Sequence, residues 1–134
     1  MDVIESIEKN VGKLWYTLNS EGKATEQKII KDIKIKNNIF YGAVGWLARE
    51  NKIRQENNYY ILGETNLTQK IGKNAGKVWL VLDTWGEVDI TSITKLARID
   101  EKDVFFAIGW LAREGKIATA NNNNNQNQFK FLLK

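Results

Sequence analysis

The sequence predicts a mainly helical α+β protein that contains two tandem copies of one small unit. Three observations support this fold class. A segment of the chain recurs 64 residues further on, its apolar residues have helical spacing, and each copy ends in two short apolar runs separated by polar residues. Because the pattern changes from helical to alternating within each copy, each unit is expected to combine three helices with a β-hairpin.

The internal repeat is the strongest signal in the chain. Residues 7–18 read IEKNVGKLWYTL and residues 71–82 read IGKNAGKVWLVL. The same offset, without a gap, carries AVGWLARENKI at 43–53 onto AIGWLAREGKI at 107–117. Self-similarity at one fixed offset indicates a duplicated structural unit. We therefore predict two domains, residues 1–64 and residues 65–134.

The first helix of each unit is predicted from an amphipathic pattern, because its apolar residues recur at intervals of three and four. These positions are Ile7, Val11, Leu14, Trp15 and Leu18, matched by Ile71, Ala75, Val78, Trp79 and Leu82. Four tryptophans recur at equivalent places of the two copies: Trp15, Trp46, Trp79 and Trp110. They are interpreted mainly as core or interface residues, with base stacking as the open alternative.

A short second helix is expected after a break at a glycine. The break falls at Gly22 or Gly86, and residues 88–90 then have the pattern of a short strand. Thr25 or Thr91 is the expected N-cap of the following helix. The apolar residues of that helix are Ile29 and Ile33, or Ile93 and Leu96.

The third helix is expected to run from a tight turn at residues 35–37 to about Arg49. Its core stripe is Phe40, Ala43, Val44 and Leu47, matched by Val104, Ala107, Ile108 and Leu111. In the second copy, Asp100 and Asp103 supply acidic capping groups at the helix start. The runs KIRQ and YYIL, or KIAT and FKFLL, then predict a strand, a turn and a returning strand.

Helix, short strand, helix, tight turn, helix and hairpin is the element order of a winged helix-turn-helix, in which the hairpin is the wing. A three-helix bundle without a wing is the alternative, but the alternation in NNYYIL and NQFKFLL favours the winged form. The wing tips, residues 56–58 and 121–128, carry no lysine or arginine. The Asn-rich second tip is interpreted as a flexible loop, with a minor-groove arm as the alternative.

The combination of GKLW or GKVW in the first helix with GWLARE and KI at the end of the third resembles a known family. It is a family of small bacterial and archaeal winged helix-turn-helix proteins, known mainly as a domain of unknown function. The resemblance covers nearly all of each repeat. It implies the fold and DNA binding, and it brings no catalytic residues with it.

Composition narrows the classes of function. The chain has neither cysteine nor histidine, which removes thiol and imidazole chemistry and the usual zinc ligands. We expect no enzyme, no cofactor and no metal site. The N-terminus lacks an apolar leader, so a cytoplasmic protein without a membrane span is expected. The net charge of +4 is compatible with a polyanionic partner, such as double-stranded DNA.

Candidate DNA-contacting cations are found on the second and third helices. Those predicted to meet phosphates are Lys28, Lys31, Lys34, Lys95 and Arg98 on the second helices, with Arg49 and Arg113 on the third. Ordinary solvated side chains remain the alternative for the lysines. From these residues we form a first hypothesis, that the protein binds DNA weakly or non-specifically, as a transcriptional regulator or general binder.

The outer face of the third helices favours close packing over base readout. At helical spacing this face and its flank carry small and aromatic residues, namely Gly42, Gly45, Trp46, Phe106, Gly109 and Trp110. A second hypothesis is therefore a protein-interaction adaptor that uses these apolar surfaces. We further predict that the two repeats pack on each other through their third helices as a pseudo-twofold pair, with the Phe106 ring seated on the bare surface at Gly42 and Gly45.

Overall fold

A computed structural model describes residues 2–120 and 129–134 of the chain. The predicted flexible Asn-rich tip, residues 121–128, lies outside the described residues. Repeat 1 contains α1 (Val3–Glu21), β1 (Lys23–Thr25), α2 (Glu26–Ile33), α3 (Asn37–Arg49), β2 (Ile53–Glu56) and β3 (Tyr59–Leu62). Repeat 2 contains α4 (Lys73–Trp85), β4 (Val88–Asp89), α5 (Ile90–Ala97), α6 (Glu101–Arg113), β5 (Ile117–Ala120) and β6 (Lys130–Leu133). The linker ends in a π-helical turn, η1 (Thr68–Gly72), that leads directly into α4.

The first helices end where the sequence predicts a break. Gly22 and Gly86 follow α1 and α4 with φ angles of +82° and +81°, a backbone conformation that glycine adopts without steric cost. The helix starts differ between the repeats. Asp2 caps α1 by accepting a hydrogen bond from the Glu5 N–H at 2.9 Å, whereas α4 continues from the π-helical turn without a side-chain cap.

The second helices are capped at equivalent positions by different residues. Thr25 caps α2, as predicted, by accepting from the Lys28 N–H. The predicted cap Thr91 is wrong: Asp89 caps α5, accepting from the Ser92 N–H at 2.8 Å. Asp89 stands 64 residues after Thr25, so the duplicated position keeps its capping function through a stronger, charged acceptor.

The third helices supply the centre of the core. Phe40, Val44 and their counterparts Val104 and Ile108 are fully buried, in agreement with the predicted stripe. Asp100 caps α6 through the Asp103 N–H at 3.0 Å. Lys36 occupies the same place before α3 and provides no side-chain hydrogen bond, so the two third helices begin with unequal stabilisation.

Each repeat carries a wing, which confirms the winged form over a bundle of helices alone. Both sheets are antiparallel and have three strands, ordered β1-β3-β2 in repeat 1 and β4-β6-β5 in repeat 2. Their registers correspond, because Ala24 pairs with Tyr60 and Val88 with Phe131. The fold is therefore a mainly helical α+β structure made of two winged helix-turn-helix units.

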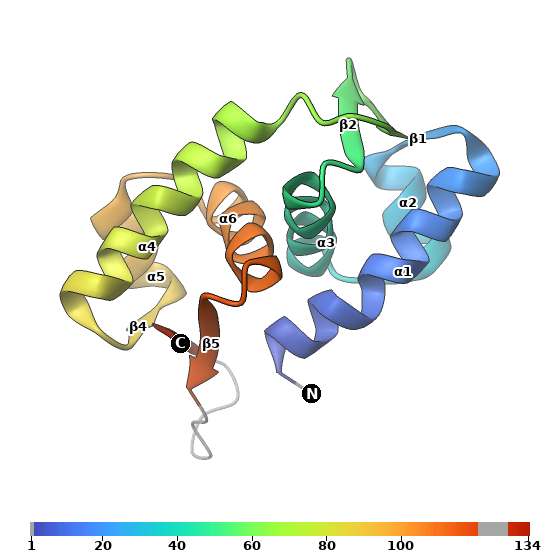
Figure 1. Cartoon of the computed structure of the whole chain (residues 1–134). Coiled ribbons are helices and arrows are strands. Elements are labelled where there is room, and N and C mark those ends of the chain that lie inside the picture. The colour runs from blue at the N-terminus through green and yellow to red at the C-terminus, as the bar shows by residue number, and fades with distance from the viewer. Residues whose placement is uncertain (1, 121–128) are drawn as a thin grey trace.

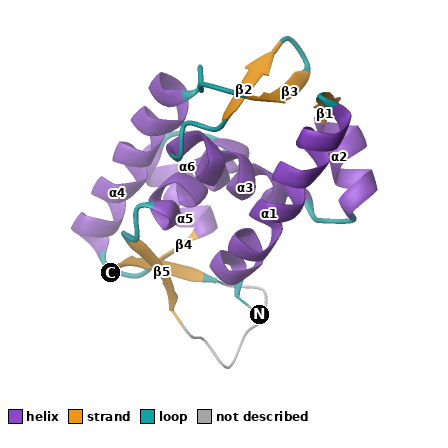
Figure 2. Ribbon diagram, turned by 45° about the vertical axis from the view of Figure 1, so that its right-hand side comes forward, coloured by secondary structure: helices purple, strands orange, loops and turns teal. Residues whose placement is uncertain are grey.

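The two repeats pack together around their third helices. Figure 1 shows α3 and α6 side by side at the centre, with α1 and α2 on one side and α4 and α5 on the other. Figure 2 shows the two sheets at opposite ends of this helical layer. Buried residues of both repeats form one continuous apolar core across the junction. Within residues 2–120 and 129–134, no helix has the length and apolarity that crossing a membrane requires.

Candidate functional sites

Glycines of α3 and α6 bring the backbones of the two repeats into close contact. A Cβ added to Gly45 would lie 2.9 Å from the carbonyl carbon of Phe106, and a Cβ added to Gly109 would lie 2.8 Å from the Cα of Gly42. Gly45 and Gly109 are equivalent positions, as are Gly42 and Phe106. The contact is thus reciprocal, as in the interface of a twofold dimer, and it brings backbone against backbone.

Reciprocal ion pairs border the same interface. Arg49 Nε lies 3.1 Å from a carboxylate oxygen of Glu114, and Arg113 Nε lies 2.9 Å from one of Glu50. The Arg49 guanidinium also lies over the Trp110 ring, 5.8 Å from its centroid. Because the glutamate side chains are less than one-fifth exposed, these pairs are better shielded from water than ordinary surface pairs.

The predicted seating of Phe106 on a bare glycine surface is not what the structure contains. The Phe106 ring lies against the Tyr41 ring, with centroids 5.0 Å apart. A Cβ at Gly42 would instead overlap the side chain of Ile7, from α1 of the same repeat. A side chain is excluded at Gly42 because α1 crosses α3 there. The Phe106 ring of α6 packs against the neighbouring residue, Tyr41.

The tryptophans divide into two kinds. Trp46 and Trp110 are partly buried against the core, and the Trp110 ring approaches Gly72 closely enough that a Cβ there would lie 3.3 Å away. Trp15 and Trp79 are 41% and 36% exposed, so their interpretation as core residues is wrong. In both first helices the preceding residue points into the core, which leaves the tryptophan on the flank.

Both functional hypotheses require exposed third helices, but in this packing α3 and α6 cover each other. Arg49 and Arg113, predicted to contact DNA, are held in the inter-repeat ion pairs. Gly42, Gly45 and Gly109 are buried, as is Phe106. The surface suggested for a protein-interaction adaptor is therefore covered by the other repeat of the same chain, because an apolar helix face is most stable when another face covers it.

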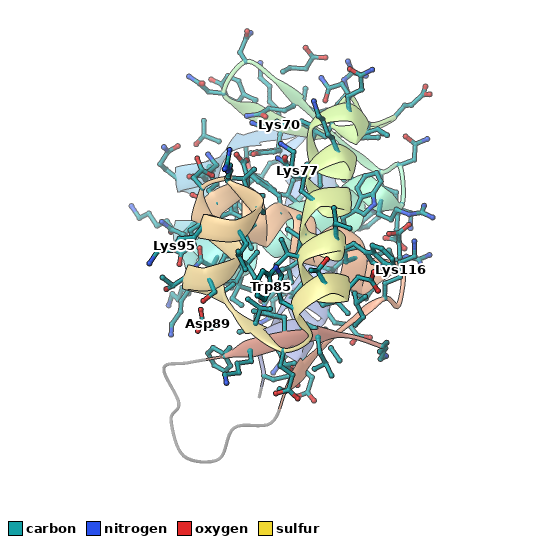
Figure 3. The ribbon with its side chains drawn as sticks, turned by 90° about the vertical axis from the view of Figure 1, so that its left-hand side faces the viewer. Lys70, Lys77, Trp85, Asp89, Lys95 and Lys116 are labelled. Carbon is teal, nitrogen blue, oxygen red and sulfur yellow. The ribbon has the colours of Figure 1, made fainter. Side chains whose placement is uncertain are left out.

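The cations of the second helices remain exposed, but they are not equivalent. Lys28 lies 3.0 Å from Asp32 and 3.9 Å from Glu21, and the hydrogen bond to Asp32 raises the pKa of its ammonium group. Four other predicted cations make no ion pair within the part of the chain that the structure describes: Lys31, Lys34, Lys95 and Arg98. Figure 3 shows Lys95 on the same face of repeat 2 as Lys70 and Lys77.

The sequence pattern did not predict one polar cluster, because its members come from both repeats. The Tyr41 hydroxyl donates to Glu26 at 3.1 Å, and Lys102 Nζ lies 3.7 Å from the other carboxylate oxygen of Glu26. Burial, followed by the Glu26 charge, raises the pKa of Tyr41. No motif joins these residues along the chain, so only the docking of the repeats brings them together.

The element order, the two wings and the helix-turn-helix geometry define a tandem winged helix-turn-helix protein. The family model described as "Winged helix-turn-helix domain (DUF2582)" matches the chain twice, over residues 1–62 and 66–130. The chain belongs to this family and contains two copies of its domain, which confirms the resemblance seen in the sequence. No curated protein matches the chain.

Proposed function

We propose that the protein binds duplex DNA without sequence preference, through phosphate contacts made by its second helices. Two observations support the proposal: the winged helix-turn-helix fold, and exposed cations retained at the same positions of both repeats. Lys31 corresponds to Lys95, and Lys34 corresponds to Arg98. Phosphate contacts from such positions supply affinity and orientation without reading bases.

The proposal excludes base readout by the third helices. In most helix-turn-helix complexes that helix enters the major groove and presents polar side chains to base edges. Here α3 and α6 cover each other, and their terminal arginines pair with Glu114 and Glu50. Binding through the remaining cations is expected to be weak and dependent on salt. We propose no catalytic step, since the chain has no histidine or cysteine to serve as the usual base or nucleophile.

The key observation is the pair of exposed cations retained at the end of each second helix, one in the last turn (Lys31, Lys95) and one at the C-cap (Lys34, Arg98), so the test removes them together. We expect the variant Lys31→Gln/Lys34→Gln/Lys95→Gln/Arg98→Gln to bind a random-sequence duplex more weakly than the wild type. Fluorescence anisotropy between about 50 and 200 mM salt should show a shallower dependence on salt, because each lost phosphate contact lowers the logarithmic slope by roughly 0.9.

A control variant uses two lysines that are also equivalent between the repeats but lie near glutamates. Lys52 Nζ is 3.8 Å from Glu50, and Lys116 Nζ is 3.6 Å from Glu114. The variant Lys52→Gln/Lys116→Gln removes two positive charges and should retain most of the binding. The proposal fails if the wild type does not bind duplex at low salt, or if the slopes of the fourfold variant and the wild type agree.

A further inference from the structure

The outer side of α4 carries a stripe of four residues, which we call the α4 face. Its members are Lys73, Gly76, Leu80 and Asp83, and their intervals of three and four residues place them on one side of the helix. All four are exposed, and Leu80 is 58% exposed. Figure 3 shows α4 on the side of the molecule that is turned toward the viewer. The α4 face is therefore accessible to a partner.

Packing inside the chain does not explain the glycine of the α4 face. Glycine inside a helix lowers its stability relative to alanine. A Cβ at Gly76 would meet no atom within 4 Å among the residues that the structure describes. Gly12, the equivalent residue of α1, has the same free space. A glycine on an open helix surface allows the backbone of a second helix to approach closely.

The α4 face is complementary to a second copy of itself. When two copies of α4 lie antiparallel, centred at the level of residue 78, Leu80 of each copy lies opposite Gly76 of the other. Lys73 of each copy then lies opposite Asp83 of the other. Each leucine fills the space above a glycine, and each ammonium group meets a carboxylate. A parallel pairing in register would place Lys73 against Lys73, so charge selects the antiparallel arrangement.

The charges of this pairing are available. Lys73 and Asp83 make no ion pair within the part of the chain that the structure describes. The third charged residue of α4 is Lys77, which would lie beside Lys77 of the second copy on one flank, as a like-charge contact. On the other flank Trp79, 36% exposed, would lie beside its counterpart and extend the apolar contact. Two attractive pairs thus oppose one repulsive pair.

The corresponding face of α1 lacks this complementarity. Its residues are Lys9, Gly12, Tyr16 and Asn19. Because Asn19 stands at the position of Asp83, Lys9 would meet no carboxylate if two copies of α1 paired in the same way. The α1 face therefore provides matched control positions for the α4 face.

We propose that the protein forms a weak twofold dimer through the α4 face, with the two copies of α4 antiparallel. Contacts between identical patches on two copies are the commonest kind in soluble oligomers. The contact is small, so its dissociation constant is expected between roughly 10 μM and 1 mM. This inference goes beyond DNA binding and does not depend on it.

The first test measures self-association of the full-length wild type without DNA. Sedimentation equilibrium between about 10 μM and 1 mM should show the average mass rising from 15.4 kDa toward twice that value. Nuclear magnetic resonance over the same range should show concentration-dependent shifts at Gly76, Leu80 and Asp83. A monomer at the highest concentration, or shifts confined to α1 or another region, would overturn the proposal.

Two lysines of α4 test the arrangement through opposite effects. Lys73→Gln removes both ion pairs and should weaken the dimer by about threefold or more. Lys77→Gln removes the like-charge contact and should tighten the dimer by about twofold or more. Both variants lower the net charge by one, so the change in general repulsion between copies is the same. Effects of the same direction and size would rule out the antiparallel pairing.

The two open glycines test the close approach of the helices. Gly76→Gln places a side chain between the helices and should weaken the dimer by about tenfold or more. The matched control Gly12→Gln should stay within about twofold of the wild type. Glutamine favours a helix over glycine, and both positions have free space, so both variants are expected to fold. Undiminished dimerisation of Gly76→Gln would overturn the proposal. If that variant does not fold, the pair of lysine variants decides the question.

Discussion

At the scale of single residues, glycine has two opposite roles in this chain. Gly45 and Gly109 lie where α3 and α6 meet, and any side chain there would overlap the backbone of the other helix. Gly12 and Gly76 also lie inside helices, yet a Cβ at either position would have no neighbour within 4 Å among the residues that the structure describes. Since glycine in a helix costs about 1 kcal/mol relative to alanine, the first pair is explained by close packing and the second is not.

Alanine substitutions should therefore have opposite signs at the two kinds of glycine. We expect Gly109→Ala to lower the free energy of unfolding by about 1–3 kcal/mol through overpacking. Gly76→Ala should raise it by about 0.5–1 kcal/mol through helix propensity. Urea denaturation of each variant beside the wild type measures both changes. Two changes of the same sign would contradict the assignment of Gly109 to a tight interface.

At the scale of the elements, capping separates helices that the sequence pattern makes equivalent. Asp100 caps α6, whereas Lys36 leaves the start of α3 without a side-chain acceptor. The short second helices have acceptors of different strength, the Thr25 hydroxyl and the Asp89 carboxylate. The second helices (8 residues each) and the third helices (13 residues each) thus have the same length in both repeats but unequal end stabilisation.

Adding the Asp100 cap at the equivalent position before α3 should stabilise the protein, and removing it from α6 should destabilise the protein. Lys36→Asp copies the start of α6 onto α3 and should raise the free energy of unfolding by about 0.5–1 kcal/mol. Asp100→Ala should lower it by about 1 kcal/mol. Thermal and chemical denaturation check both variants. A loss of stability in Lys36→Asp would mean that the backbone before α3 does not admit the cap.

The α5 cap also predicts a dependence on pH. Hydrogen bonds from Ser92 hold the pKa of Asp89 below its ordinary value of 3.8. A carboxyl with a lowered pKa in the folded state stabilises the protein above its unfolded pKa, and this contribution is lost as the pH falls through the folded value. Asp89→Asn should therefore lose less stability than the wild type between pH 5 and the acid limit of folding.

The difference in pH dependence between the wild type and Asp89→Asn separates the contribution of Asp89 from those of the other acidic residues. Burial and the neighbouring Asp100 raise the pKa of Asp103, which acts in the opposite direction on acidification. Asp103 is present in both proteins and cancels in the comparison. Parallel stability curves for wild type and Asp89→Asn would remove the proposed contribution of the cap.

At the scale of the whole molecule, the seam between α3 and α6 makes two small domains into one body. The buried residues of both repeats are contiguous, and ion pairs border the junction at Arg49–Glu114 and Arg113–Glu50. A domain of about 60 residues buries too little surface to be very stable alone, so sharing a core is expected to benefit both repeats.

The two repeats should consequently move and unfold together. Nitrogen-15 relaxation should give one rotational correlation time for residues of both repeats, and urea unfolding should follow one transition by fluorescence and circular dichroism. A variant with a bulky residue in the seam, Gly109→Val, should split the transition or broaden it. Two correlation times in the wild type would contradict a rigid seam.

The sequence by itself determined the local structure of this protein. The offset of 64 residues, the helical spacing of the apolar residues and the alternation near the ends predicted two winged units, and the glycine breaks and the Asp100 cap were found where expected. It also indicated that the third helices were suited to packing, because their outer faces carry small and aromatic residues. These features depend on neighbours within a few residues, which a sequence pattern records.

Only the tertiary structure decided which surfaces remain available for function. The pairing of Arg49 with Glu114, the position of the Phe106 ring on Tyr41 and the bridge from Lys102 to Glu26 all join residues of different repeats. A cavity of about 690 Å³ follows from the same docking, because its walls include Ile39 of repeat 1 and Ile90 and Phe105 of repeat 2. Such contacts depend on how two preformed units meet in space, and the spacing of residues along one chain does not specify that geometry.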